Sequence, residues 1–513
     1  MPPSLPTSAL LRRYSQVYPV GSAGSRFPET LKARRRAHLE AFGSAKVPFV
    51  LFAGVPREPG AENIWVMSAL KIFQEPAVIH LTGINQPNVI LALVPGARSL
   101  GGGKFCDEEV LFLPEKNPER EFWDGVRFGI PTAPPAAKPT GKSAVNNGKP
   151  GVNANLRAVA GSPDLEDIRT LTGIRDVRPL GEFEEWFEAL VRKVKPARGQ
   201  TFWHRYVDDK GKVQETRTDH NFAFKQKLEK LARGVRRDFT LETCAPLHYR
   251  LRLPLDRDQV KDVGLAVEAT RAAFVETLAE VRTGSIKTET ELEARLQYGM
   301  LRRSPFGLAF PSIIAGGRNA TVLHYLKNDE PLPKAGLVLM DFGARWGTMH
   351  ADITRVFPLN GRFNPLQALI YGIVLDAAKL NERNAKAGAT IRQLNEAVWA
   401  FVEQALKERF FDKGGKAVRA YNGKPHGVSH LMGEQEHDGD PHRIYQDHPL
   451  QPGWQISNEP GLYGHFSITL GGKRYAEWIG IRIEDDLLIT RTGCRNLSSS
   501  IPKEIAEIEA LLS

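Results

Sequence analysis

Apolar and polar residues are patterned in two ways over the first 195 residues. Helical spacing over 30–45 and 119–130 predicts amphipathic helices. Short apolar runs ended by glycine or proline predict buried strands, at 47–54, 77–83, 88–96 and 110–116. Because these strands alternate with helices, we expect a smaller α/β domain at 1–195.

Two stretches depart from this pattern. Residues 131–155 are rich in Pro, Ala, Gly, Lys and Asn and hold almost no large apolar side chains. Such a composition cannot bury enough surface to offset the ordering entropy, so we predict a mobile insertion. Residues 196–250 are highly charged and are expected to form a connecting segment with a helix at 222–237.

From residue 251 to 513, long helical patterns come before strand-like segments. Pairs of helices are predicted, at 256–284 and 288–303 and again at 365–388 and 391–411. Thr288 and Glu291 have the spacing of a capping box. Two strands are expected over 310–325, around the glycine pair at 316–317. These patterns predict an α+β domain.

Charge and composition narrow the functional classes. The 513 residues are 42% hydrophobic and 25% charged, with a net charge of +10. The basic residues are dispersed without a nucleic-acid motif, so we interpret them as a solvated surface that binds neither nucleic acid nor membrane. No secretory signal and no apolar run long enough to span a bilayer are present. Three distant cysteines (Cys106, Cys244 and Cys494) fit neither a zinc cluster nor a disulfide framework and indicate a reducing cytoplasm.

The densest candidate chemistry lies in PHGVSHLMGEQEHD, residues 425–438. Three histidines, His426, His430 and His437, fall within this stretch. Imidazole binds metals and transfers protons near neutral pH, so this density predicts a site.

Four carboxylates lie in hydrophobic, strand-like surroundings on either side of the histidines: Asp341, Asp352, Glu459 and Glu484. An unpaired buried carboxylate is costly, and a pair of divalent cations would remove that cost. Oxygen ligands with one imidazole suit manganese, cobalt or zinc better than calcium. For any one carboxylate alone, a buried salt bridge explains the pattern equally well. Because side chains alternate along a strand, Arg482 and Glu484 are expected to point the same way.

The order of these motifs resembles the creatinase/aminopeptidase family of metallopeptidases, and most closely aminopeptidase P and Xaa-Pro dipeptidase. The matching segments are LHY at 323–325, MDFGARWGTMHADITRVF, HGVSHLMGEQEHD, NEPGLY and IRIEDDLLIT. FQEPAVIHLTGINQPNVILALVP is similar to the amino-terminal signature of that family. The resemblance implies a pita-bread catalytic domain preceded by the smaller α/β domain.

The resemblance also implies roles for individual residues. The five expected ligands of a dinuclear metal centre are Asp341, Asp352, His430, Glu459 and Glu484. The residues expected to contact substrate are His324, His426, His437, Tyr463 and Arg482, and catalytic roles are expected for His324, His437, Arg482 and Glu459. The chain departs from the family at Glu434–Glu436, where apolar residues are common, and also at His350 and Asn458.

The function implied is hydrolysis of the Xaa-Pro bond at the amino terminus of peptides, by a hydroxide that two divalent metal ions activate. Manganese is the expected metal, with cobalt or zinc as alternatives. The expected partners are peptides with proline in second position, and the expected assembly is a homodimer or homotetramer. Two alternatives stay open, an Xaa-Pro dipeptidase (prolidase) and a peptide-binding protein without catalytic activity. Creatinase lacks the metal ligands, so the intact set of five disfavours it.

Overall fold

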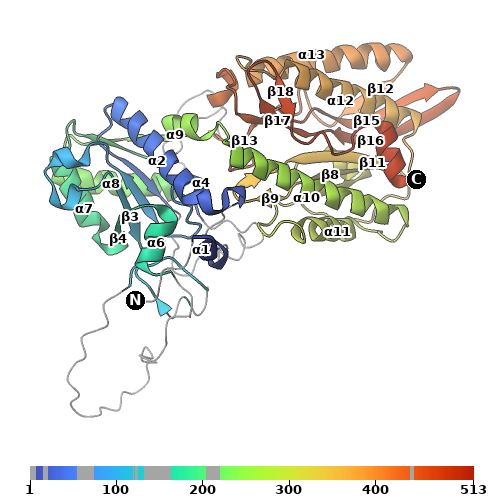
Figure 1. Ribbon diagram of the computed structural model, residues 1–513. Coiled ribbons are helices and arrows are strands. Elements are labelled where there is room, and N and C mark those ends of the chain that lie inside the picture. Colours follow the sequence, from blue (N-terminus) through green and yellow to red (C-terminus); the bar gives the residue numbers. More distant parts are fainter. Residues whose placement is uncertain are drawn as a thin grey trace, which may run out of the picture. The chain divides into compact units, whose positions relative to one another are not determined.

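The computed structural model of the protein describes residues 7–14, 21–54, 74–118, 121, 125–131, 163–203, 220–439 and 444–513. The chain divides into two compact units, of which Leu251 ends the first and Arg252 begins the second (Figure 1). The insertion predicted at 131–155 lies outside the described residues apart from Pro131. Among the residues that the structure describes, no helix is long and apolar enough to cross a membrane.

A mixed six-stranded sheet in the order β4-β3-β2-β1-β5-β6 forms the first unit. Its strands are β1 (Val50–Ala53), β2 (Ile90–Leu93), β3 (Glu109–Leu113), β4 (Asp176–Pro179), β5 (Arg198–Thr201) and β6 (Thr240–Thr243). The helices are α1 (Thr7–Arg13), α2 (Phe27–Ser44), α4 (Pro76–Thr82), α6 (Leu165–Thr172), α7 (Phe183–Lys193), α8 (His220–Val235) and α9 (Ala245–Arg252). The strands expected at 47–54, 88–96 and 110–116 correspond to β1, β2 and β3.

Two elements of this unit were predicted wrongly. The helix expected over 119–130 does not include residues 125–130, which are not helical. Residues 77–83 were expected to be a strand, but Pro76–Thr82 form helix α4. Every residue from Ala77 to Thr82 is buried, so no polar face reveals the helical period in the sequence. The local signals are Pro76 in the first turn and Gly83, whose φ of 74° ends the helix.

The described part of 196–250 is not only a connection between units. It contributes β5 and β6 to the sheet of the first unit, together with α8 and nearly all of α9. β5 pairs in parallel with β1, and β6 pairs in parallel with β5. Lys227, Lys230 and Arg233 of α8 are exposed, and such charges made the stretch resemble a solvated connection in the sequence.

The second unit combines five helices with several small sheets among its described residues. The helices are α10 (Arg257–Arg282), α11 (Glu289–Leu301), α12 (Pro365–Asn384), α13 (Ile391–Arg409) and α14 (Ile505–Leu512). The strands are β7 (Ile313–Gly316), β8 (Leu337–Phe342), β9 (Arg345–Trp346), β10 (Met349–His350), β11 (Ile353–Pro358), β12 (Lys416–Arg419), β13 (Leu431–Met432), β14 (Gln455–Asn458), β15 (Gly461–Leu470), β16 (Lys473–Arg482), β17 (Asp485–Ile489) and β18 (Cys494–Asn496). The sheets run β11-β8-β7, β10-β9, β12-β15-β16 and β13-β14-β17-β18.

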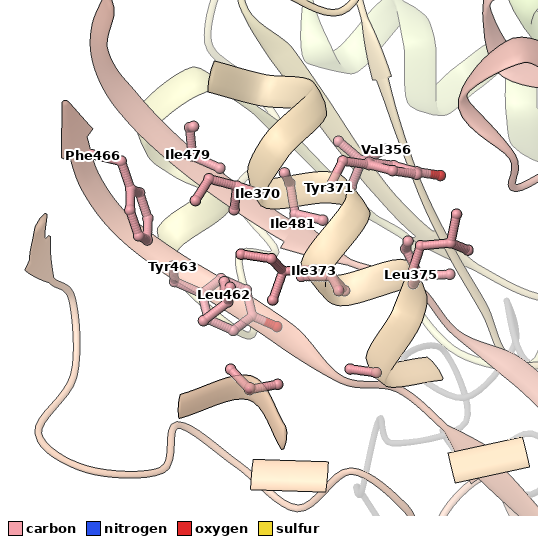
Figure 2. Packing of buried hydrophobic residues seen from close by; sticks show 14 of the residues in the cluster. Val356, Ile370, Tyr371, Ile373, Leu375, Leu462, Tyr463, Phe466, Ile479 and Ile481 are labelled. Carbon is pink, nitrogen blue, oxygen red and sulfur yellow. The ribbon is translucent and has the colours of Figure 1, made fainter. Parts of the chain in front are cut away.

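Each pair of long helices covers its own part of the strands. One buried cluster joins α10 and α11 to β7, β8 and β11. A second joins α12 and α13 to β15 and β16, where Ile370 and Ile373 pack with Leu462 and Ile481 (Figure 2). Burying a large aliphatic side chain stabilises a fold by about 1.5–3 kcal/mol, so these clusters hold the strands rigidly. Strands held in this way carry the candidate site at their ends.

Local sequence fixes where the helices begin. The predicted capping box is confirmed, because Thr288 Oγ1 accepts from the Glu291 amide and the Glu291 carboxylate accepts from the Thr288 amide. Helices α10, α12 and α13 begin with capping boxes of the same kind. The pair of strands expected over 310–325 is only half correct. Ile313–Gly316 form β7, but Gly317–Thr321 form a short 3₁₀ helix, which Gly317 permits with a φ of 55°.

Candidate metal centre

The four carboxylates and His430 lie at or just beyond strand ends of the second unit. Asp341 is in β8, opposite Thr354 of β11, and Asp352 immediately precedes β11. His430 precedes β13, Glu459 follows β14, and Glu484 separates β16 from β17. The tight hairpin of β9 and β10 turns the chain between the two aspartates. Segments far apart in the sequence therefore meet at one place.

Distances between the side chains describe a compact group. His430 Nε2 lies 3.6 Å from an Asp352 oxygen and 3.5 Å from a Glu459 oxygen. Atoms of Asp352, His430 and Glu484 that could bind a metal all lie within 4.8 Å of one another. Asp341 joins the group through Arg482, whose Nη2 donates to Asp341 Oδ2 at 2.5 Å.

Burial and mutual repulsion make the negative charges of this group unfavourable. Burial raises the pKa of Asp352 well above its usual range, and the charges of Glu484 and Asp341 raise it further. Burial together with Asp341 raises the pKa of Glu484 to about 8. The pKa of Glu459 is also raised well above its usual value, first by burial and then by Glu484. Positive charge placed among these oxygens would relieve the repulsion.

His430 has the protonation state that a metal ligand needs. Burial lowers its pKa to about 3, so the imidazole is neutral at physiological pH. Its Nδ1 lies 3.2 Å from the carbonyl oxygen of Leu431, which can only accept, so Nδ1 carries the proton. Nε2 therefore directs a lone pair toward Asp352 and Glu459. This arrangement fixes the ring as it is fixed in many metal sites.

The residues present fit a divalent cation. Oδ1 of Asp341 is buried and has no hydrogen-bond partner among the described residues. A buried carboxylate oxygen without a donor is rare in folded proteins unless an ion or water contacts it. Four carboxylates and one neutral imidazole are the donor set of magnesium-like and borderline divalent ions. Since the excess charge is negative and the free atoms are acceptors, a cation is the group that completes the site.

A network of hydrogen bonds lies next to the carboxylates. Arg482 Nε donates to Thr354 Oγ1 at 2.9 Å, and Nη1 donates to the Tyr463 hydroxyl at 3.2 Å. Thr354 Oγ1 in turn donates to Glu484 at 2.7 Å. Arg482 and Glu484 approach to 3.9 Å, which confirms that they point the same way.

Tyr463 connects this network to His426. His426 Nδ1 lies 2.7 Å from the Gly427 carbonyl and must donate there, so Nε2 accepts from the Tyr463 hydroxyl at 2.9 Å. Burial lowers the pKa of His426 to about 4, and burial raises the pKa of Tyr463 to about 12. Both groups are therefore neutral near pH 7. The donor and the acceptor of each hydrogen bond between His426, Tyr463 and Arg482 are thus determined.

The other two predicted histidines are more exposed and face a cavity of about 620 Å³. The ring of His437 stacks on that of His430 with centroids 4.1 Å apart. A hydrogen bond with Glu436 raises the pKa of His437. His324 lines the cavity from the segment between β7 and β8. The cavity also has apolar walls, formed by Phe310, Pro311, Ile313, Leu323, Leu326 and Ile391.

Sequence reasoning missed two residues of this region, Thr354 and Ser457, and noted Glu436 only as a departure from the family. Thr354 bridges Arg482 and Glu484, and Ser457 Oγ accepts from the His430 amide at 2.9 Å. Glu436 lines the cavity. The alternation of β11 contains a signal for Thr354, since it follows Asp352 by two residues and pairs with Asp341. Two of the noted departures lie elsewhere: His350 Nδ1 contacts the Gly433 carbonyl at 3.1 Å, and Asn458 is buried against α12.

Comparison with known protein families identifies the family of this chain. The model of metallopeptidase family M24 matches residues 262–491, which include all five candidate ligands. The model of the aminopeptidase P N-terminal domain matches residues 63–138. This chain belongs to metallopeptidase family M24, in its aminopeptidase P group. It is accordingly a hydrolase with a divalent-metal site, and its second unit has the pita-bread fold, preceded by the smaller α/β domain.

Relatives with similar sequences cover most of the chain. Rat Xaa-Pro aminopeptidase 3 is 28% identical over 446 residues, which are 86% of this chain and 76% of that protein. The Xaa-Pro aminopeptidase of Escherichia coli is 28% identical over 442 residues, 84% of this chain and 87% of that protein. Both alignments therefore extend over the two units.

Solved structures have the same fold. Pseudomonas aeruginosa aminopeptidase PepP is similar with a TM-score of 0.69 and 25% identity, covering 94% of this chain and 98% of that one. A zinc-substituted Escherichia coli aminopeptidase P in complex with product is similar with a TM-score of 0.68 and 23% identity, covering 94% and 98%.

Proposed function

We propose that this protein is an Xaa-Pro aminopeptidase, which releases the first residue of peptides that have proline in second position. One observation carries the proposal: three buried carboxylates, the partly buried Glu459 and a neutral imidazole open into a cavity beside His324, His437 and the Tyr463–Arg482 pair. The two Xaa-Pro aminopeptidases whose sequences align over both units support it. We also propose that residues 251–513 form the catalytic domain.

We propose that Asp341, Asp352, His430, Glu459 and Glu484 hold two divalent ions. Manganese is our first expectation, with cobalt or zinc as alternatives, because oxygen-rich sets with one imidazole suit these metals. When bound, such a pair polarises the scissile carbonyl and lowers the pKa of a water molecule from about 15.7 toward about 7.

The side chains of the chain itself would carry the proton transfers. Glu459, whose carboxylate lies 3.5 Å from His430 Nε2, accepts the proton of the attacking water. That proton then passes to the proline nitrogen as the C–N bond breaks. His437 and His324 donate hydrogen bonds to the carbonyl oxygen, whose negative charge grows in the transition state. Arg482 orients Asp341 and, through Thr354, Glu484.

Proline imposes a chemical requirement on the enzyme. The nitrogen of an Xaa-Pro bond carries no hydrogen, so a peptidase that binds its substrate through that N–H fails on it. The cavity has apolar walls at Phe310 and Leu323 that could cover the pyrrolidine ring. Because the reaction needs no donor at this nitrogen, the site is compatible with such a bond.

The test is a comparison of peptides with metal-reconstituted protein. We expect cleavage of Ala-Pro-Ala and longer Ala-Pro peptides, and little cleavage of Ala-Ala-Ala. Glu459→Gln should abolish turnover, whereas Glu408→Gln, an exposed carboxylate of α13, should keep it. Cleavage of Ala-Pro alone would establish a dipeptidase instead. Peptide binding without any cleavage, in protein that contains metal, would refute the enzymatic proposal.

We further propose that the protein acts in the cytoplasm, because Cys106, Cys244 and Cys494 are all free thiols. A homodimer or homotetramer remains our expectation for the assembly. Sedimentation velocity of the purified protein measures the assembly directly.

A further inference from the structure

Two acidic side chains that line the cavity, Glu436 and Asp438, take no part in the mechanism above. Asp438 is buried and pairs with Arg252, so Glu436 is the one whose charge a substrate can meet. Glu436 lies on the segment after β13 and lines the same cavity as the candidate ligands. Its carboxylate is 31% exposed and approaches His437 Nε2 to 3.4 Å. Apolar residues are common at this place in the family that the sequence resembles, so the charge is a property of this chain.

The segment that carries Glu436 is held firmly. Buried Arg252 forms ion pairs with Glu434, at 3.6 Å, and with Asp438. Gln259 Nε2 donates to Glu434 at 3.1 Å, and the Glu434 amide donates to Asp438 at 3.1 Å. Glu436 is therefore fixed on the cavity wall, because the residues on both sides of it are anchored to α10 and to the segment before it.

The charge of Glu436 reaches the centre of the site. It contributes to the raised pKa values of Asp341, Asp352 and Glu484. With two divalent ions bound, the four ligand carboxylates and Arg482 leave about one positive charge. The negative charge of Glu436 lowers the net charge of the site by one, which reduces the repulsion of a positively charged substrate side chain.

The proposed reaction limits which substrate group Glu436 would meet. The scissile carbonyl would have to lie at the candidate metal ligands, which would leave the α-ammonium group one carbon away. The side chain of the first residue would then extend along the cavity wall. Glu436 lines the same cavity, is partly exposed and is not one of the ligands, so the end of a long first side chain is the group we expect it to meet.

We propose that Glu436 is a specificity-determining residue that makes the cavity prefer peptides whose first residue is lysine or arginine over those whose first residue is acidic. This inference rests on the proposed function. A partly exposed ion pair contributes modestly, and repulsion of an acidic side chain adds an effect of similar size. Together they predict a preference of about tenfold for Arg-Pro over Glu-Pro substrates.

The experiment measures kcat/KM for Arg-Pro-Ala, Ala-Pro-Ala and Glu-Pro-Ala at pH 8.5, where His437 carries less positive charge. In wild-type protein the Arg-Pro to Glu-Pro ratio should be about ten. Glu436→Gln should bring that ratio near one, and Glu436→Lys should invert it. Glu408→Gln, the exposed control, should keep the wild-type ratio. Metal per chain is measured for every variant to exclude loss of ions.

A second readout does not depend on turnover. Calorimetry measures binding of analogues in which a CH group replaces the proline nitrogen, with arginine or glutamate as the first residue. The affinity ratio should follow the same pattern across the variants. An unchanged ratio in Glu436→Gln, or a charge preference that appears only at the third residue, would overturn the inference while Ala-Pro-Ala cleavage still supports the proposed function. Failure of wild-type protein to cleave any Xaa-Pro peptide would refute that function, and the calorimetric ratio would still decide the role of Glu436.

Discussion

Removing the metal ions should make the stability of the second unit depend strongly on pH. The ordinary pKa of Glu484, 4.5, rises to about 8 through burial and the nearby charge of Asp341. The folded metal-free site therefore holds a proton that the unfolded chain releases. This proton contributes stability that is fully present below pH 4.5 and is lost as the pH rises through about 8.

The size of the effect follows from the two pKa values. Each tenfold difference in proton affinity corresponds to about 1.4 kcal/mol. From pH 4.5 to about 8 the metal-free protein should therefore lose on the order of 5 kcal/mol through Glu484. Asp352 and Glu459 act in the same direction, but the three carboxylates share protons, so their contributions do not simply add. Divalent ions bind the ionised carboxylates and should remove most of this dependence.

The assay is urea unfolding between pH 5 and pH 9, with and without added manganese. Fluorescence of Trp454, which is buried next to β14, reports on the region of the site. The stabilisation by metal should increase steadily with pH. Glu484→Gln should flatten the metal-free curve, and Glu408→Gln should not. Metal-free stability that stays level or rises between pH 5 and pH 8 would refute the electrostatic account of the site.

Three further predictions concern single changes. Glu484→Gln should lower metal per chain, while His437→Ala should keep the metal, and both should slow cleavage; the opposite pattern in elemental analysis would reverse the two roles. Glu289→Gln should destabilise the unit by about 3 kcal/mol. The reason is that this buried carboxylate accepts hydrogen bonds from Gly316, Asn319, Tyr325 and Glu330. Urea unfolding, with Glu291→Gln as the comparison variant, measures the change in free energy of unfolding. Deleting 131–155 should leave turnover and melting temperature nearly unchanged, and a large fall in either would show that the segment packs against the fold.

The site residues that the sequence predicted best are carboxylates, because burying an unpaired carboxylate costs free energy. Asp341, Asp352 and Glu484 stand in apolar segments, so burial could be inferred before the structure, and the structure brings them together with His430. Thr354 escaped notice because a hydroxyl in a strand carries no such cost, although it contacts both Arg482 and Glu484. Helix α4 was missed for the opposite reason, since complete burial removes the polar positions that reveal the helical period.

Three consecutive acidic residues, Glu484, Asp485 and Asp486, show what sequence cannot decide. All three are buried, and the letters alone do not say which of them needs a metal. Neighbouring positions of a strand face opposite sides. Asp485 faces Arg355, at 2.8 Å, and Lys503, and although burial opposes ionisation these cations lower its pKa to about 2.

Glu484 and Asp486 share the other side, which has fewer cations. Burial raises the pKa of both carboxyl groups, and the negative charge of Glu484 raises the pKa of Asp486 further. Arg482 lies 3.9 Å from Glu484, but it also serves Asp341 at 2.5 Å, so one guanidinium cannot balance the carboxylates of this side. Arg355 and Lys503 therefore balance the charge of Asp485 on one side of this segment. On the other side, the carboxylates need divalent ions to be stable in their ionised form at neutral pH.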